Sequence, residues 1–357
     1  MVANEYELKV LDYTAELCKF DLRNTAVLAR QHLLSTTYDL FEKLFAKGLD
    51  ANNVFLLGKC YSTNKEVYDC FIARGVYISP YSCTFDSHRP FDEQTQEGIE
   101  KLIEAALPRL SDIEKMLILD DGGDLLLACK DINKNKYGVE QTSSGFRKLK
   151  STTLQYPIVN VARSEAKLKL ESPMIAEAVT RKLAPYLKKD SKILIVGKGP
   201  IGNSIYELLN KRYLVTCYDI SDKNKFQLSQ YDVIIGCTGE TIIQPEQLKQ
   251  CKKGAVLASA SSSDIEFPAL AMRKSIPRSR DCHQAISLNG ITLLNGGFPI
   301  NFDGSKHSVP PEKIQLTRSL LLVGINQALQ SCENGLIALN TGMQNKIIEK
   351  YAAISSD

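Results

Sequence analysis

The chain has 357 residues, of which 44% are hydrophobic and 24% charged. This composition is typical of globular proteins and excludes the disordered and fibrous classes, and the length is sufficient for two domains. The 44 basic and 41 acidic side chains are scattered and leave a formal net charge of +3, so the sequence offers no concentrated positive charge for a nucleic-acid partner.

Cysteine usage and hydropathy indicate the compartment. Ten cysteines are present, but no two form a C-x-x-C pair and no nearby histidines complete a zinc site. We therefore expect free thiols, no metal site and the reducing environment of the cytoplasm. The first residues include acids and no apolar stretch, unlike a secretion signal. No apolar run approaches the ~20 residues needed to span a bilayer, so we expect no membrane partner.

In the first part of the chain, helical periods alternate with short β-rich runs. Residues 25–45 and 94–107 have helical periodicity, whereas residues 54–57 and 116–119 predict strands. The last of these runs ends in the acidic segment Asp120-Asp121-Gly122-Gly123-Asp124. Carboxylates at the end of a strand often belong to ligand sites in open α/β sheets.

The second part alternates compact strands and helices. Residues 157–161 predict a strand, and Ser172 and Pro173 are suited to the N-cap and first position of a helix that runs to about Leu187. A long amphipathic helix begins at Pro310 and Pro311. Five further buried strands are expected at residues 192–196, 214–218, 233–236, 255–259 and 291–294. This rhythm predicts a parallel, doubly wound sheet.

A glycine fingerprint follows the first of these five strands. Gly197, Gly199 and Gly202 form a G-x-G-x-x-G loop directly between a strand and a helix, and the next strand ends in Asp219. The loop comprises Gly197, Lys198, Gly199, Pro200, Ile201 and Gly202. Its glycines let a pyrophosphate approach the backbone, and the carboxylate can hold ribose hydroxyls while it disfavours a 2′-phosphate. The sequence therefore predicts a bound NAD rather than NADP.

The expected fold is α/β with two domains and a cleft between them. One domain has a Rossmann-type doubly wound parallel sheet, binds NAD and spans residues 188–311. The other is an α/β substrate domain at residues 1–187, completed by residues 312–357. A homodimer through the cofactor domains is compatible with the sequence.

Four separated segments together resemble the S-adenosylhomocysteine hydrolases. They are residues 119–125, residues 138–145, residues 157–171, and the glycine fingerprint with Cys237-Thr238-Gly239 after it. Their order and spacing match over roughly residues 57–329. In that family, tightly held NAD oxidises the 3′-hydroxyl of a nucleoside so that a 5′-thiol can be eliminated.

The resemblance assigns roles to individual residues. It implies that Lys167 takes the hydroxyl proton during hydride transfer, that Asp121 acts beside the sugar as an acid or base, and that Glu171 supplies a further carboxylate. Besides the glycine loop, the implied NAD contacts are Thr142, Ser143, Ser144, Asp219, Cys237, Thr238 and Gly239.

The departures from the family concern substrate recognition. The family's catalytic histidine falls on Tyr61, its adenine-reading glutamate on Lys65, and a second glutamate on Gln141; Thr63 remains a candidate substrate contact. Lys65 in place of an acid would favour an anionic substrate. His32 is interpreted as a structural residue in a helix. The family's C-terminal extension, which reaches into a neighbouring subunit, has no counterpart in the sequence.

These observations predict an NAD-dependent enzyme, either an adenosylhomocysteinase-like hydrolase or lyase, or a dehydrogenase. We expect hydride transfer at a hydroxyl-bearing carbon of a small substrate other than adenosylhomocysteine. Two alternatives remain open: a non-catalytic NAD-binding regulatory protein, and a genuine S-adenosylhomocysteine hydrolase.

Overall fold

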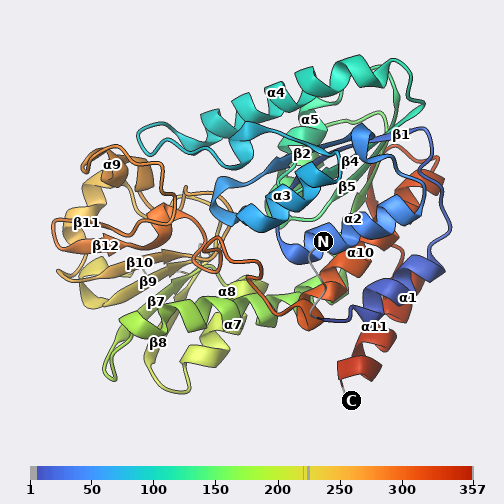
Figure 1. Ribbon diagram of the computed structural model, residues 1–357. Coiled ribbons are helices and arrows are strands. Elements are labelled where there is room, and N and C mark those ends of the chain that lie inside the picture. The colour runs from blue at the N-terminus through green and yellow to red at the C-terminus, as the bar shows by residue number, and fades with distance from the viewer. Residues whose placement is uncertain (1–5, 220, 223–225, 356–357) are drawn as a thin grey trace. The chain divides into compact units, whose positions relative to one another are not determined.

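The computed structural model describes residues 6–219, 221–222 and 226–355, and the chain divides into two compact units. The first unit contains the described residues of Met1–Cys83, Thr95–Glu171 and Gly304–Asp357. The second contains Thr84–Gln94 and the described residues of Ser172–Asp303. Each unit has its own sheet (Figure 1) and its own apolar core.

In the first unit, seven strands of the described residues form a sheet in the order β13-β6-β5-β4-β1-β2-β3, and all neighbours are parallel. The strands are β1 (Thr25–Gln31), β2 (Val54–Gly58), β3 (Tyr77–Ile78), β4 (Lys115–Asp120), β5 (Asn135–Glu140), β6 (Pro157–Asn160) and β13 (Gly335–Ala338). The helices are α1 (Lys9–Leu17), α2 (Ser35–Ala46), α3 (Lys65–Ala73), α4 (Phe91–Leu110), α5 (Asp124–Ala128), α6 (Ser143–Lys150), α10 (Pro311–Gln330) and α11 (Thr341–Ser355).

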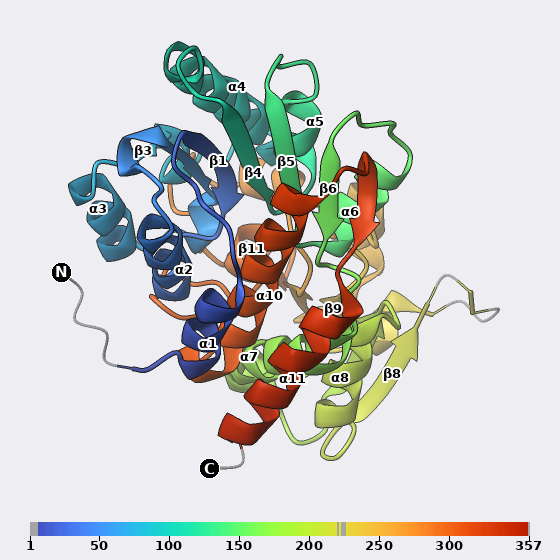
Figure 2. The ribbon, with the colours of Figure 1, turned by 90° about the vertical axis from the view of Figure 1, so that its right-hand side faces the viewer.

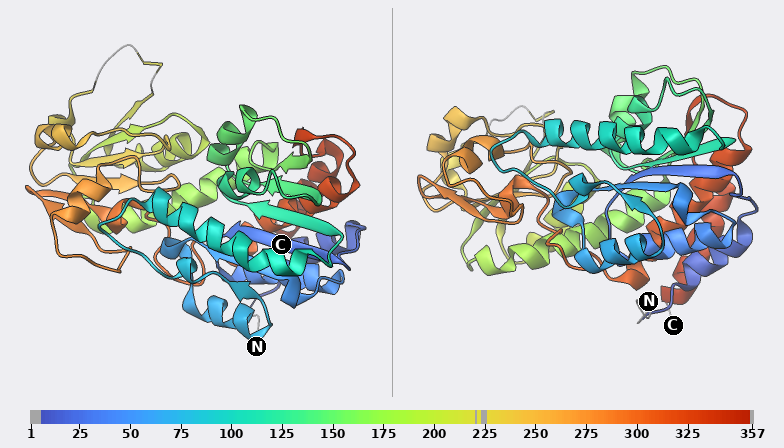
Figure 3. Two further views of the ribbon diagram at one scale, coloured as in Figure 1. Left: turned by 90° about the horizontal axis from the view of Figure 1, so that it is seen from above. Right: turned by 45° about the horizontal axis from the view of Figure 1, so that its top comes forward.

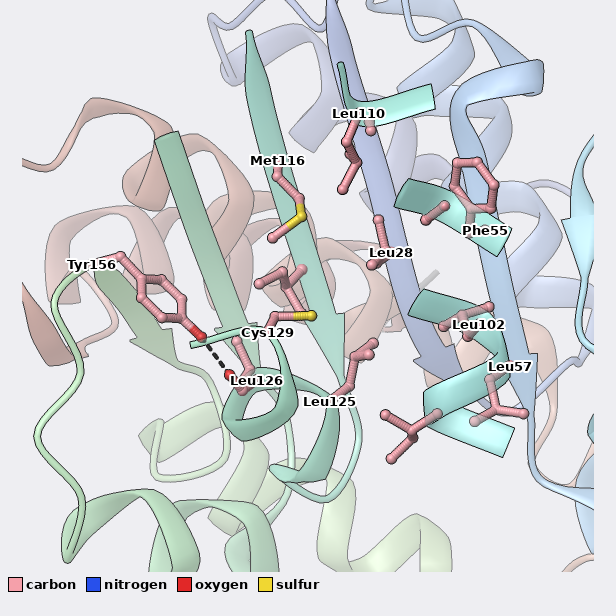
Figure 4. Close-up of a cluster of buried hydrophobic side chains, with 14 of the residues drawn as sticks. Leu28, Phe55, Leu57, Leu102, Leu110, Met116, Leu125, Leu126, Cys129 and Tyr156 are labelled. Atoms are coloured by element: carbon pink, nitrogen blue, oxygen red, sulfur yellow. Dashed lines mark hydrogen bonds between the residues drawn. The ribbon is translucent and has the colours of Figure 1, made fainter. Parts of the chain in front are cut away.

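Helices α4 and α5 cover one face of this sheet. Leu28 and Leu57 on the strands meet Leu102 of α4 and Leu126 of α5 in one apolar cluster (Figure 4). Helix α4 lies along the strands in both views of Figure 3. Because helices cover it, the strand β1 is buried at every residue, as is usual for parallel sheets.

Helix α10 covers the opposite face and packs against β5 and β6. A Cβ at Gly324 would lie 3.0 Å from Val161 and 3.1 Å from Val139, so this glycine allows the close approach of helix and sheet. Helices α1, α2 and α11 pack on α10, and Figure 2 shows α10 beside α1 and α11. Strand β13, which follows α10, extends the sheet at β6.

In the second unit, six strands of the described residues have the order β11-β12-β10-β9-β7-β8. They are β7 (Lys192–Val196), β8 (Leu214–Tyr218), β9 (Val233–Gly236), β10 (Val256–Ser259), β11 (Ile286–Leu288) and β12 (Ile291–Leu293). All pairs are parallel except β11 with β12. The helices are α7 (Ser172–Leu183), α8 (Pro200–Leu209) and α9 (Ala269–Lys274).

Both faces of the second sheet are buried. Ile193 and Ile195 of β7 face a cluster that includes Val179 of α7 and Ile205 of α8. The alternate residue Leu194 faces the other cluster, which includes Met272 of α9. The predicted doubly wound parallel sheet is therefore confirmed, with an antiparallel strand at one edge.

The expected helix at residues 25–45 is wrong for its first part. Residues Thr25–Gln31 form the central strand β1, and the helix α2 begins only at Ser35. The cause is burial on both faces, which makes residues 26–29 of β1 a short apolar run without the alternation that identifies a half-exposed strand.

The two units also differ from the expected domains at three places. Helix α7 belongs to the second unit, where it packs on α8, and it ends at Leu183 rather than near Leu187. Residues 304–311 belong to the first unit. Thr84–Gln94, which includes the first turn of α4, belongs to the second unit, where the buried Arg273 donates from Nε to the Ser87 carbonyl at 3.1 Å.

Among the helices in the described part of the chain, none combines the length and apolar character that crossing a bilayer would require.

A buried hydrogen bond between Tyr156 and α5 offers a test of the first unit's core. The Tyr156 hydroxyl donates to the Leu126 carbonyl at 2.7 Å (Figure 4). We expect Tyr156→Phe to lower the free energy of unfolding by about 1–3 kcal/mol, because it leaves a buried carbonyl without a donor. The control Tyr77→Phe removes a hydroxyl from a half-exposed ring and should change little. Equal losses in urea unfolding would contradict this assignment.

Candidate functional site

In both sheets, the order of the strands reverses at one point. Strand β1 has β2 on one side and β4 on the other, and β7 is flanked by β8 and β9. In open parallel sheets, loops diverge at the carboxyl ends of such strand pairs, and ligands bind there. The predicted site residues follow these strands: Asp121 comes after β4, and Gly197 comes after β7.

At the carboxyl edge of the first sheet, three side chains converge on Asp121. The Lys59 ammonium pairs with Oδ1, and the Gln141 amide donates to Oδ2. His32 Nε2 lies 3.4 Å from the same Oδ2. The side chains of Asp121 and Lys59 are 4% and 3% exposed, so this is a buried ion pair with further hydrogen bonds. Both Gln141 and Asp121 were predicted to be site residues, and they contact each other. The sequence did not predict Lys59 and His32 as members of the site.

His32 is positioned by the loop after β1 and not by a helix, so its assignment to a helix is wrong. Its Nδ1 lies 2.5 Å from the Ser62 hydroxyl, and its ring meets Tyr61 edge-on with centroids 6.0 Å apart. Because Nε2 faces a carboxylate, which accepts, we infer that Nε2 carries the proton and Nδ1 accepts from Ser62. The imidazole expected at position 61 is therefore present beside Asp121, but it comes from His32.

Burial and charge act in opposite directions on this cluster. Burial alone would raise the pKa of Asp121, but the Lys59 charge and the His32 contact hold it well below 3.8. Burial lowers the pKa of His32 below 6.5 against the attraction of Asp121. At neutral pH the site therefore contains a firmly ionised carboxylate and a neutral imidazole. Asp121 can accept a hydrogen bond from a ligand but is not suited to donate a proton.

Asp120 and Glu140 form a second acidic pair at adjacent strand ends. They are opposite each other in the β4–β5 register, and neither is exposed. Burial raises the pKa of Asp120 to about 6, despite the charge of Arg30, and it raises that of Glu140 well above 4.5, with a contribution from Asp120. Glu140 accepts from the backbone N–H of Thr142 at 2.6 Å and of Gly122 at 3.3 Å. This glutamate thereby fixes the loops after β4 and β5.

Lys167 and Glu171 bind each other on one turn of π-helix. The Lys167 ammonium lies 2.6 and 2.9 Å from the two carboxylate oxygens, and both side chains are about 15% exposed (16% and 14%). The π-helical turn spans Lys167–Glu171, and such turns often occur at functional sites. Lys169 points to a different partner, since it pairs with Glu165 among exposed side chains.

The other predicted contacts of the first unit have local roles. Thr142 caps α6: its hydroxyl accepts from the Gly145 N–H at 3.0 Å and donates to Glu140 at 2.6 Å, and the Ser144 hydroxyl lies 3.2 Å away. Ser143 is exposed. Thr63 donates to the Lys59 carbonyl at 3.1 Å. Lys65 is an exposed residue at the start of α3 that pairs with Asp69, so nothing aims it at Asp121.

In the second unit, the glycine loop has the geometry that a pyrophosphate requires. Gly197 has φ +111°, and a Cβ at Gly202 would lie 1.9 Å from the Gly197 carbonyl oxygen. A Cβ at Gly199 would meet no atom within 4 Å, so open space lies beside its backbone. Gly199 is the N-cap of α8, and Pro200 is the first helical residue, followed by Ile201. The helix therefore directs its free N–H groups and positive dipole end to this space.

The Asp219 carboxylate lies at the end of β8 and accepts from the Lys198 N–H at 2.8 Å. Its position after the neighbouring strand is the one from which an acid reaches a ribose. The Lys198 ammonium is directed away to Asp222, at 2.9 Å. Lys198, the one cationic residue of the Gly197–Gly202 loop, is thus already paired with a carboxylate.

A buried glutamate that the sequence interpretation missed organises the loop after β9. The Glu266 carboxylate accepts from the backbone N–H of Thr238 at 2.7 Å and of Gly239 at 3.1 Å, and from the Ser259 hydroxyl at 2.6 Å. Cys237 begins this loop, and a Cβ at Gly197 would lie 2.8 Å from its carbonyl oxygen. The segment Cys237-Thr238-Gly239 is therefore held beside the glycine loop.

Comparison of the sequence with known proteins finds similar proteins but does not show which family the chain belongs to. No family model matches the sequence. An uncharacterized protein of Mycobacterium tuberculosis strain H37Rv is 38% identical over 306 residues, and this alignment covers 80% of the chain and 60% of that relative. The chain thus spans less than two thirds of the relative's length.

Two more distant similarities were found. Adenosylhomocysteinase of Thermotoga maritima is 26% identical over 227 residues, 55% of each chain. The A chain of dipicolinate synthase from Bacillus subtilis is 12% identical, and its structure superposes with a TM-score of 0.43 over 87% of this chain and 98% of that one. A TM-score this low supports no conclusion.

The buried pair of Lys59 and Asp121 predicts a large effect of mutation. We expect Lys59→Met to lower the free energy of unfolding at pH 7 by about 3–5 kcal/mol, since it leaves a buried carboxylate without its cation. The control Lys101→Met breaks an exposed pair with Glu104 and should have almost no effect.

The pH dependence of this loss follows from the lowered pKa of Asp121. The stability that the pair contributes is complete above the unfolded-state value of 3.8 and is lost as pH falls toward the lower folded-state pKa. The difference between wild type and Lys59→Met in urea unfolding should therefore shrink as pH falls below 3.8. A difference that stays constant would show that the ion pair is not its source.

Proposed function

We propose that the protein binds NAD through its second unit and uses it for hydride transfer at a hydroxyl-bearing carbon of a small substrate bound by the first unit. The observation that carries the first half is the Gly199 backbone, which faces open space at the N-terminus of α8 while Gly197 and Gly202 meet closely behind it. The residues therefore fit a dinucleotide.

The second unit's own residues would hold the cofactor. The N–H groups of the Gly197–Gly202 loop and of the first turn of α8 would bind the pyrophosphate. Asp219 would accept from the ribose hydroxyls, and its charge favours NAD over NADP. The loop from Cys237 to Gly239, fixed by Glu266, would bound the site on the β9 side. When bound, NAD supplies a hydride acceptor and donor.

The first unit's residues would manage the substrate hydroxyl and its proton. Lys167 is the proposed acceptor of the hydroxyl proton: its ammonium would first pass a proton to Glu171, which contacts it, and the resulting amine would then accept the proton of the substrate hydroxyl. Asp121, kept ionised by Lys59, would accept a hydrogen bond from a substrate hydroxyl. The neutral imidazole of His32 would fix the orientation of the Asp121 carboxylate by donating a hydrogen bond from Nε2 to Oδ2.

A second candidate function is adenosylhomocysteine hydrolysis. His32 beside Asp121 favours it, because an imidazole is present there although position 61 is a tyrosine. The Thermotoga adenosylhomocysteinase is also similar over 55% of the chain. A third candidate, a non-catalytic NAD-binding protein, makes the same cofactor contacts without any redox change.

Cofactor binding can be tested at a single glycine. We expect the full chain to bind NAD more tightly than NADP, and Gly199→Ala to weaken NAD binding by roughly tenfold or more, about 1.4 kcal/mol, because its methyl group would occupy the space of the pyrophosphate. The protein should still fold, since that Cβ meets no atom of the chain. The control Gly342→Ala, on the exposed side of α11, should bind normally. Unchanged affinity in Gly199→Ala would exclude this site.

Chemistry can be tested with two neighbouring lysines. With NAD bound, a panel of nucleosides, sugars and amino-acid derivatives is screened for cofactor reduction by near-ultraviolet absorbance. We expect Lys167→Ala to lower the rate about 100-fold or more, as expected for loss of a proton acceptor. Lys169→Ala, which breaks the exposed pair with Glu165, should leave the rate unchanged.

The outcomes separate the three candidates. Release of homocysteine from adenosylhomocysteine would establish the second candidate. Tight NAD binding with no redox change across the whole panel would support the third and reject the enzyme. Equal effects of the two lysine substitutions would refute the role of Lys167.

A further inference from the structure

Three arginines of the described residues are almost fully buried, and two of them have evident structural roles. Arg273 donates from Nε to Ser87, from Nη1 to Gly296 at 2.9 Å and from Nη2 to Asp264 at 2.5 Å. Arg30 pairs through Nη1 with Asp124 at 2.8 Å. Each of these guanidinium groups is neutralised by a carboxylate that contacts it directly.

Arg318 is the exception. It lies in the middle of α10 with 4% of its surface exposed, and its Nε donates to the Thr36 hydroxyl at 3.2 Å. Among the described residues, no carboxylate lies within 4.0 Å of its guanidinium, and Nη1 and Nη2 have no hydrogen-bond partner. An arginine stays charged in proteins, so this buried cation keeps four N–H donors available.

The surrounding carboxylates are bound to other groups. Glu171 holds Lys167, Asp121 holds Lys59, and Asp39 accepts from Tyr6 at 2.8 Å. All three are near enough to act on Arg318 electrostatically: burial lowers its pKa from 12.5, and these charges oppose that shift. Thr36, the hydrogen-bond partner of Arg318, lies at the start of α2, just after the carboxyl end of β1. Arg318 therefore lies at the same edge of the first sheet as the Asp121 cluster, with its charge balanced at a distance but without a carboxylate in direct contact.

Although Arg318 as a whole is only 4% exposed, its Nη1 and Nη2 are not fully buried, so both donors reach space that a ligand can enter. A largely buried charge without a counter-ion in direct contact destabilises the fold. The planar guanidinium matches a carboxylate or phosphate through two parallel hydrogen bonds. An oxyanion bound from solution would contact the Arg318 guanidinium directly and so stabilise its charge, which no carboxylate of the described residues does.

The local charges favour a monoanion. The cations Lys59, Lys167 and Arg318 are matched in number by the anions of Asp121, Glu171 and Asp39. A dianionic phosphate would therefore add two negative charges to an already balanced group, whereas a carboxylate adds one. Lys65, which the sequence suggested as the anion-binding residue, is exposed and paired with Asp69.

We propose that Arg318 binds the carboxylate of the substrate in the first unit. The substrate of this protein is therefore a small carboxylic acid that also carries the reacting hydroxyl group. That Arg318 binds a carboxylate does not depend on the proposed function. That the same molecule is the substrate of hydride transfer does rest on it.

The first test measures ligand-dependent stability of the full chain. Sodium acetate and sodium glycolate are titrated at an ionic strength held constant with sodium chloride, and inorganic phosphate is titrated in parallel. We expect the two carboxylates to raise the unfolding midpoint of the wild type in a saturable way, whereas phosphate does not. A larger effect of phosphate, or no effect of either carboxylate, would overturn the proposal.

Substitutions locate the effect. Arg318→Met should abolish the carboxylate response, and Arg318→Lys should weaken carboxylate binding about tenfold or more, because an ammonium lacks the planar pair of donors. Arg74→Met, which alters an exposed arginine of the same unit, should respond as the wild type does. A carboxylate response that persists in Arg318→Met would contradict the assignment.

Stability without ligand distinguishes a binding residue from a structural one. A structural arginine is required for folding, whereas removal of a buried charge that has no carboxylate in direct contact leaves stability equal or higher. We therefore expect Arg318→Met without carboxylate to unfold at the same urea concentration as wild type or at a higher one. A clear loss would identify Arg318 as structural, and Arg318→Lys then still tests binding. NAD titration of the same variants reports separately on the second unit, so failure of cofactor binding would leave these results interpretable.

Discussion

The structure depends on one constraint, the parallel arrangement of strands on both sides of a central strand. Because the strands of each sheet are parallel, apart from the edge strand β11, their carboxyl ends lie at one edge of the sheet. Because the order reverses at β1 and at β7, the loops diverge there. In the first unit, this constraint brings the loops after β1, β2, β4 and β5 to Asp121. In the second, it brings the glycine loop and the Cys237–Gly239 segment together. Side chains remote in sequence become neighbours for this reason alone.

Buried glutamates fix these diverging loops in both units. Glu140 accepts from backbone N–H groups after β4 and β5, and Glu266 does the same after β9. Each is buried where a neighbouring glycine leaves room: a Cβ at Gly145 would lie 2.3 Å from the Glu140 carboxyl, and one at Gly236 would lie 2.5 Å from Glu266. These two glycines thus leave room for a carboxyl group, and the carboxyl group fixes the loops by accepting hydrogen bonds from several backbone N–H groups. Arg318 differs from these glutamates: it is a buried charged group in which only Nε has a partner in the protein. Its remaining N–H donors are therefore the ones we propose to bind a ligand.

The second unit could be predicted from the sequence almost element by element, whereas the first could not. The strand, glycine loop, helix and acid at residues 192–219 are local in sequence, so their spacing alone identifies them. His32 meets Asp121 across 89 positions of the chain, and Lys59 meets it across 62, as the contacts of these residues show. No local pattern reports such a pair. His32 was further hidden because β1 is buried on both faces and lacks the alternation of an exposed strand. A prediction of β1 as a strand would have placed His32 at a carboxyl end and marked it as a candidate.

The most direct test of the account is amide hydrogen exchange of the full chain with and without NAD. We expect NAD to slow exchange at residues 197–202 and 237–239, the two loops that diverge at β7 and β9, while the apolar core of the first unit around Leu28 and Leu126 is unchanged. Protection confined to these loops would support a dinucleotide at the reversal point of the second sheet. Exchange that NAD leaves unaltered in both loops, at concentrations where binding is detected by other means, would contradict it.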